Sequence, residues 1–132
     1  MSEQDNVAAA QRGYEYFTSG DIPSLVNIFA DDVVWDLPKI ENVPFSGKHT
    51  GRAAVAEFFR LVGENQEALS FNRESFVAQG EKVVVLGNYV WKVKATGREF
   101  SGDFAHVFTF RDGKAVAFNE FLDSAALAAA YK

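Results

Sequence analysis

The sequence contains no cysteine, so disulfide bonds, thiolate metal ligands and thiol nucleophiles are excluded. No apolar run approaches the ~20 residues that span a bilayer, and the first residues lack the basic and apolar regions of a signal peptide. The formal net charge is −5 and the isoelectric point is near 5.0, which disfavours nucleic acid as a partner. With only two histidines, metal ligation is not expected either. These absences favour a cytoplasmic protein without a cofactor and without a nucleic-acid or membrane partner.

Aromatic side chains are the abundant feature, with 13 Phe, four Tyr and two Trp among 132 residues. The hydrophobic fraction is 48% and the charged fraction 23%, which is typical of a globular protein rather than a disordered or fibrous one. The length predicts one domain over residues 1–132. Such a chain can build a core and still have aromatic side chains left to line a cavity.

Helical signals dominate the first half of the chain. Apolar residues at helical spacing predict a helix over 5–19 that ends at Gly20. Asp21 is expected to cap a short second helix with Pro23 in its first turn, and Gly51 to open a third helix. Between them, β-branched and aromatic residues predict a strand over 33–37, closed by Pro38, and a loop over 38–50.

The second half reads as strands over 70–79, 82–95, 100–110 and 114–123, followed by a terminal helical turn over 125–131 capped by Ser124. Helices followed by consecutive antiparallel strands predict an α+β fold. We expect a cone-shaped, curved antiparallel sheet with the three N-terminal helices packed on its concave face. The convex face carries smaller side chains, which makes a homodimer through that face plausible.

The last hairpin places two titratable residues on the bulky face of the sheet. A three-residue turn over 111–113 pairs Phe110 with Lys114, which sets His106 opposite Phe118 and Glu120 opposite Phe104. His106 and Glu120 are then diagonal neighbours within reach of each other. In a dry cavity such a pair can transfer a proton at neutral pH. The alternative is a core histidine satisfied by Glu120, without chemistry.

Other polar residues offer weaker candidates. Strand alternation turns Asp36 and Asp103 away from the concave face, and His49 lies in a polar loop, so solvent exposure is the simpler interpretation for all three. Tyr14 lies on the apolar stripe of the first helix, where its hydroxyl can contact a substrate or make one packing hydrogen bond.

The sequence resembles the SnoaL-like group of the nuclear transport factor two-like superfamily, which includes ketosteroid isomerase and polyketide cyclases. The resemblance covers nearly the whole chain and rests on the segments 17–21, 29–35, 46–52, 104–114 and 120–123. It implies an α+β cone that encloses a pocket. Because the superfamily contains isomerases, cyclases, hydrolases and binding proteins, the resemblance alone does not identify an activity.

Residue by residue, the resemblance favours a cyclase-like site. Ketosteroid isomerases have an Asp that removes the substrate proton where this chain has Leu37, and an oxyanion-hole Tyr where it has Gly13. Steroid isomerisation by that route is therefore not expected. Polyketide cyclases have a His and an acidic residue at the positions of His106 and Glu120. In them the acid is an Asp that acts in an aldol ring closure without a metal.

The sequence therefore supports two hypotheses. In the first, the protein is an isomerase-, cyclase- or lyase-type enzyme in which Glu120 transfers a proton of a small hydrophobic carbonyl compound and His106 orients or polarises. In the second, it is a non-catalytic module that binds a hydrophobic ligand or joins a complex. The expected cavity wall, for which an ordinary core role is the alternative, consists of Tyr14, Phe17, Trp35, Leu37, Phe59, Tyr89, Trp91, Phe104, Phe108, Phe118 and Leu122.

Overall fold

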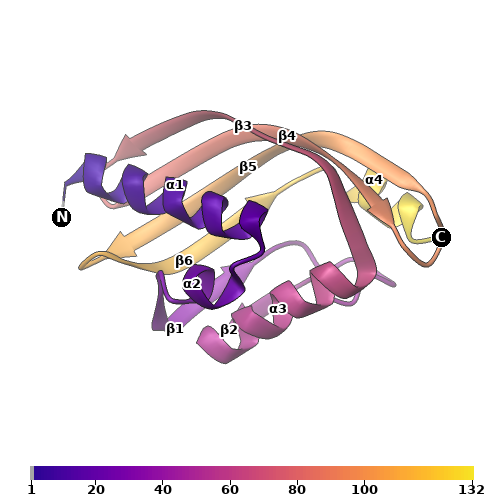
Figure 1. Cartoon of the computed structure of the whole chain (residues 1–132), viewed down its shortest axis with the longest axis horizontal. Coiled ribbons are helices and arrows are strands. Elements are labelled where there is room, and N and C mark those ends of the chain that lie inside the picture. Colours follow the sequence, from indigo (N-terminus) through magenta and orange to yellow (C-terminus); the bar gives the residue numbers. More distant parts are fainter. Residues whose placement is uncertain (1) are drawn as a thin grey trace.

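The computed structural model describes residues 2–132, which form a curved six-stranded sheet and four helices (Figure 1). The helices are α1 (Glu3–Ser19), α2 (Ile22–Val26), α3 (Arg52–Asn65) and α4 (Ser124–Ala130). The strands are β1 (Phe29–Asp36), β2 (Lys48–Thr50), β3 (Gln66–Gln79), β4 (Lys82–Val93), β5 (Glu99–Arg111) and β6 (Lys114–Phe121). The strand order is β2-β1-β6-β5-β4-β3.

The predicted α+β architecture, with helices α1, α2 and α3 on the concave side of a curved sheet, is confirmed (Figure 1). One pair departs from the antiparallel prediction, because β1 and β6 run parallel and the sheet is therefore mixed. The short strand β2 lies within residues 38–50, for which the sequence predicts a loop. Among residues 2–132, no helix has both the length and the apolar character needed to cross a bilayer.

Helix α1 is fixed at both ends by its sequence. Ser2 and Asp5 form a reciprocal capping box at its start, and Gly20 ends it in the left-handed conformation with φ 79°. Its buried face is narrow and built largely from small residues. A Cβ added at Gly13 would lie 2.9 Å from the side chain of Ile28, so α1 approaches the end of α2 more closely than a larger residue would allow.

The loop between β1 and β2 contributes to the core instead of lying on the surface. Ile40, Val43 and Phe45 are buried in it, as is Leu37 at its start. The hydroxyl of Ser46 accepts a hydrogen bond from the backbone N–H of Ile40, which ties the loop into a compact turn. This segment therefore closes one side of the cone. Sequence pattern did not predict this, because the loop has no periodic spacing of apolar residues.

The β5–β6 hairpin has a different register from the predicted one. Asp112 and Gly113 form a two-residue turn with positive φ angles of 52° and 82°, as in a type I′ turn, so Arg111 pairs with Lys114. A bulge between Thr109 and Phe110 then shifts the pairing by one more residue. As a result His106 lies directly opposite Glu120, and both stay on the predicted face.

Local details at the two ends of β6 also differ from expectation. The predicted register sets Val116 opposite Phe108 on the concave face and turns Ala115 to the convex face, whereas in the structure Phe108 pairs with Phe118, Ala115 is buried and Val116 is half-buried. Helix α4 is capped by the side chain of Asp123, which accepts a hydrogen bond from the backbone of Ala126, rather than by Ser124.

The outer face of the sheet carries an apolar row across three strands. Leu86 of β4 pairs with Ala105 of β5, which pairs with Phe121 of β6, and Leu86 and Phe121 are 43% and 57% exposed. The homodimer through this convex face stays a prediction.

Gly87 occupies a point of close approach between strands. A Cβ at this position would lie 2.0 Å from the backbone oxygen of Asn72 and 2.5 Å from Cζ of Phe104. Because a backbone oxygen cannot move aside without breaking strand pairing, we expect Gly87→Ala to lower the free energy of unfolding by about 1–3 kcal/mol. Urea unfolding measures this change.

A matched control is Gly63→Ala in helix α3, where an added Cβ meets no atom within 4 Å. Because alanine has a higher helix propensity than glycine, the free energy of unfolding of this variant should rise by up to ~1 kcal/mol. A Gly87→Ala protein as stable as the wild type would contradict the close approach.

Candidate functional site

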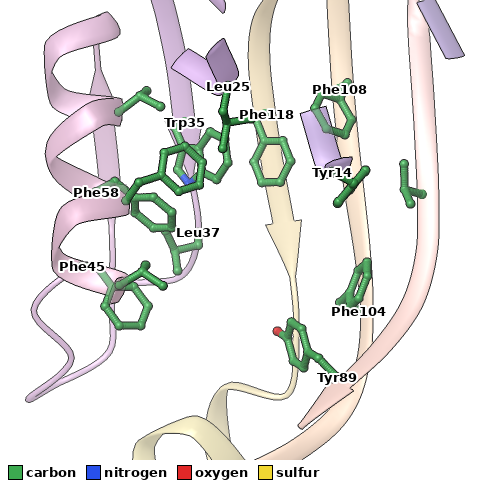
Figure 2. Packing of buried hydrophobic residues seen from close by; sticks show 14 of the residues in the cluster. Tyr14, Leu25, Trp35, Leu37, Phe45, Phe58, Tyr89, Phe104, Phe108 and Phe118 are labelled. Atoms are coloured by element: carbon green, nitrogen blue, oxygen red, sulfur yellow. The ribbon is translucent and has the colours of Figure 1, made fainter. Parts of the chain in front are cut away.

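A narrow cavity of about 80 Å³ lies inside the cone, between the concave face of the sheet and the helices. Its wall is almost entirely apolar and aromatic, with polar atoms only from a few side chains. Of the residues predicted for the site, the following line it: Tyr14, Phe17, Trp35, Leu37, Phe59, Tyr89, Trp91, His106, Phe108, Phe118, Glu120 and Leu122. Figure 2 shows the ring of Trp35 beside that of Phe118, and their centroids are 3.8 Å apart.

His106 and Glu120 meet at the cavity as a direct pair. The imidazole Nε2 lies 2.9 Å from the carboxylate Oε2, and the two side chains are only 6% and 13% exposed. Strand pairing holds them opposite each other, so each backbone fixes the position of its side chain. The structure thus brings together the two residues predicted to be catalytic.

Tyr14 extends this pair from helix α1. Its hydroxyl lies 2.6 Å from Nδ1 of His106. Burial raises the pKa of Tyr14 well above its usual 10.0; the charge of Glu120 adds to this rise and the charge of Arg73 opposes it. The phenol therefore keeps its proton and, because the Glu120 carboxylate needs a donor from Nε2, its O–H donates a hydrogen bond to Nδ1 of the neutral ring. With Nδ1 accepting, the imidazole carries its proton on Nε2, and this N–H donates a hydrogen bond to Oε2 of Glu120.

Tyr89 supplies a second donor to the same carboxylate oxygen. Its hydroxyl lies 3.2 Å from Oε2 of Glu120. Burial raises the pKa of Tyr89, and the charge of Glu120 and the hydrogen bond to it raise it further, so this hydroxyl also stays protonated. Oε2 thus receives two donors, whereas no side chain or backbone donor within residues 2–132 reaches Oε1.

Phe104 packs against His106 and does not line the cavity, which differs from its predicted role in substrate binding. Its ring stacks on the imidazole of His106 with centroids 4.1 Å apart and an interplanar angle of 20°. The space for this ring exists because Gly87 has no side chain. Phe104 therefore restrains the orientation of His106.

Sequence reasoning missed two polar residues near the cavity. Gln66, at the junction of α3 and β3, is buried in the wall and accepts a hydrogen bond of 2.8 Å from the hydroxyl of Tyr131. Arg73 lies with its guanidinium carbon 5.6 Å from the ring centroid of Tyr14. For Arg73 a signal existed, because it follows Phe71 by two residues and shares its face of the strand. Gln66 stands where helix changes to strand, and neither periodicity assigns it a face.

The remaining sequence candidates lie away from the cavity wall. Asp36 is half-buried and Asp103 exposed, and neither lines the cavity. His49 uses Nε2 for a contact of 2.7 Å with the carbonyl of Phe45, so it helps to hold the β1–β2 loop. Within residues 2–132, no three histidine or carboxylate side chains converge as a metal ligand set would require.

The buried tyrosines predict a loss of stability at alkaline pH. Each loses its proton at a higher pH in the folded chain than in the unfolded chain, where the pKa is about 10. Above that value the unfolded chain binds fewer protons, so its relative free energy falls by up to ~1.4 kcal/mol per pH unit for each such tyrosine. Tyr89→Phe removes one contribution, so the unfolding free energy of this variant should fall less steeply above pH 10.

Urea unfolding at several values between pH 8 and pH 11 measures these slopes. Tyr16→Phe, a change at a half-buried position of α1 outside the network, is the control and should keep the wild-type slope. Parallel curves for Tyr89→Phe and the wild type would show that Tyr89 is not held protonated by the fold.

Comparisons with known proteins agree with this architecture. The model of the SnoaL-like domain family matches residues 10–118. An NTF2-like protein from Burkholderia xenovorans is 34% identical with a TM-score of 0.90, and the match covers 100% of this chain and 99% of that one. An NTF2-like protein of unknown function from Burkholderia pseudomallei is 29% identical with a TM-score of 0.88, at the same coverage.

A third solved structure is TerC co-crystallised with polyporic acid, which is 28% identical with a TM-score of 0.83. The match covers 96% of this chain and 98% of that one. No curated protein matches the sequence. The family match spans most of the chain and the three structural matches span 96–100% of it, so this protein belongs to the SnoaL-like domain family and has the NTF2-like fold.

Proposed function

We propose that this protein is an enzyme that performs acid/base chemistry without a cofactor on a small hydrophobic carbonyl compound. One observation carries the proposal: two donors hold one oxygen of the Glu120 carboxylate, no donor within residues 2–132 reaches the other oxygen, and Glu120 lines an apolar cavity. A carboxylate held in this way is oriented by its partners and still has an atom available as a base.

The chemistry that fits is proton transfer at a carbon next to a carbonyl group. Oε1 of Glu120 takes the proton, the electron pair of the C–H bond moves into the carbonyl, and an enolate and a neutral carboxylic acid result. Return of the proton to a different carbon completes an isomerisation. Attack of the enolate carbon on a second carbonyl, with the proton delivered to the new alkoxide, completes an aldol cyclisation. Both routes regenerate the carboxylate.

His106 and the two tyrosines act as positioning residues in this scheme. The neutral imidazole donates Nε2–H to Oε2, and the Tyr14 hydroxyl fixes that tautomer from the other side of the ring. Tyr89 restrains the same oxygen from β4. With three groups defining its position, the carboxylate needs little reorganisation when a substrate arrives.

One of the similar structures supports a substrate of this kind. TerC, at 28% identity over nearly its whole length, was co-crystallised with polyporic acid. The resemblance to polyketide cyclases, which have a histidine and an acid at the positions of His106 and Glu120, supports the same assignment. The ketosteroid isomerase route remains disfavoured, because Leu37 and Gly13 stand where that reaction needs a base and a hydroxyl.

Exchange of carbon-bound protons tests the proposal without knowledge of the natural substrate. In D2O the wild-type protein should accelerate deuterium exchange next to the carbonyl of 2-tetralone, a flat and largely apolar ketone, as followed by proton NMR. Replacing the base by an amide in Glu120→Gln should lower the protein-dependent rate by about 10²–10⁴-fold. The shape of the side chain is retained, so the loss reports the proton-transfer role.

Glu99→Gln is the matched control, because Glu99 is an exposed carboxylate on β5, the strand that carries His106. It should leave the exchange rate unchanged. Equal rates for Glu120→Gln and the wild type would eliminate the role of Glu120. Binding of 2-tetralone without exchange in the wild type would favour the hydrophobic-ligand module instead.

A further inference from the structure

Gln66 is a buried polar residue that the acid/base network does not use. It is 5% exposed and belongs to the cavity wall, at the point where α3 ends and β3 begins. Its amide nitrogen donates no hydrogen bond to any acceptor within residues 2–132. Since buried amides normally find partners, these two N–H groups are available to a ligand.

The carboxamide has a defined orientation. Tyr131, which follows α4, donates its hydroxyl to Oε1 of Gln66 over 2.8 Å. Burial raises the pKa of Tyr131 to about 12, so this hydroxyl remains a donor at neutral pH. With the oxygen occupied, the nitrogen is the group that a ligand can address. The contact also ties the C-terminal helix to the cavity wall.

Other donors in the wall are less suitable. The hydroxyls of Tyr14 and Tyr89 are committed to His106 and Glu120. The indole nitrogen of Trp35 lacks a partner as well, but it is sealed among packed atoms and Phe58 lies 4.8 Å away between ring centroids. The amide nitrogen of Gln66 is not sealed in this way.

Gln66 lies far from Glu120 along the cavity. It pairs with Val93 on β4, whereas Tyr89, which contacts Glu120, lies four residues earlier on that strand. At ~3.3 Å per residue, this separates the two backbone levels by ~13 Å. Trp91 lies between these two levels and lines the cavity, and Phe71 lines it at the level of Tyr89. An elongated, flat compound can therefore contact both ends of the wall.

Gln66 also borders a second, more open hollow outside the cavity. The two spaces share a wall formed by Phe17, Phe59, Val62, Gln66, Phe71 and Trp91. The polar group of a bound compound would thus lie next to this outer hollow, with the apolar body directed inward.

We propose that the carboxamide of Gln66, oriented by Tyr131, binds an acceptor oxygen of the substrate remote from its reacting carbon. The substrate class is then a flat, mostly apolar carbonyl compound with a second carbonyl, ether or lactone oxygen at its other end. This inference rests on the proposed function only in taking the cavity as the substrate site. Gln66 acts in binding and not in proton transfer.

A pair of planar, nearly isosteric probes tests the inference by binding alone. 2-Acetylnaphthalene carries a carbonyl oxygen where 2-isopropenylnaphthalene carries a methylene group. The wild-type protein should prefer the ketone over the alkene, and Gln66→Leu should reduce that preference about threefold to tenfold, since one neutral hydrogen bond is lost. NMR titration gives the dissociation constants, and the side-chain amide protons of Gln66 should shift downfield with the ketone only.

Gln79→Leu is the matched control, an exposed glutamine on the same strand, and it should keep the wild-type preference. Tyr131→Phe keeps Gln66 but frees its oxygen, so it should reduce the preference by a smaller factor even if Gln66→Leu folds poorly. Equal preference in Gln66→Leu and the wild type, an unshifted amide signal, or failure of both probes to bind the wild type would overturn the inference.

The same titration on Glu120→Gln separates this inference from the proposed function. The preference for the ketone should persist there, because Gln66 does not depend on the base. If neither the wild type nor Glu120→Gln exchanges protons, the proposed function fails, but the preference for the ketone still supports the Gln66 subsite. If the wild type exchanges protons but binds both probes equally, only the Gln66 subsite is overturned.

Discussion

The Glu120 carboxylate is enclosed by aromatic rings, and much of the surrounding architecture compensates for that burial. Removing a charged carboxylate from water costs several kcal/mol unless hydrogen bonds replace the lost hydration. Here the replacement comes from His106 on β5 and Tyr89 on β4, with Tyr14 of α1 behind the imidazole. Two neighbouring strands and a helix must therefore be in place before the charge is stabilised.

Steric details serve the same arrangement. Gly13 lets α1 approach α2 closely, at a position where an ordinary side chain would contact Ile28. Gly87 leaves room for the ring of Phe104, which stacks on His106 and limits its rotation. The imidazole is thus restrained by a hydrogen bond at each nitrogen and by a ring on its face. Such restraint lowers the entropy that substrate binding has to remove.

The sequence predicted the fold and the face on which His106 and Glu120 lie, because both follow from the periodicity of apolar side chains. It predicted the wrong register for the last hairpin, since a two-residue turn and a bulge cannot be distinguished from a three-residue turn by pattern. The two errors add to an even number of residues, so His106 and Glu120 kept their face. Contacts such as Tyr14 with His106, 92 residues apart, depend on tertiary packing that spacing does not encode.

A purely structural role for the His106–Glu120 pair does not account for the carboxylate as a whole. A buried acceptor without a partner costs about 1–3 kcal/mol, so a core pair is most stable when both carboxylate oxygens are satisfied. Here the donors converge on Oε2, and no donor within residues 2–132 reaches Oε1, although the Glu120 side chain is only 13% exposed and lines the cavity. The carboxamide nitrogen of Gln66, at the other end of the wall, likewise has no hydrogen-bond partner within residues 2–132. An apolar cavity with one uncommitted acceptor and one uncommitted donor is complementary to a compound that offers an acidic proton and a remote oxygen.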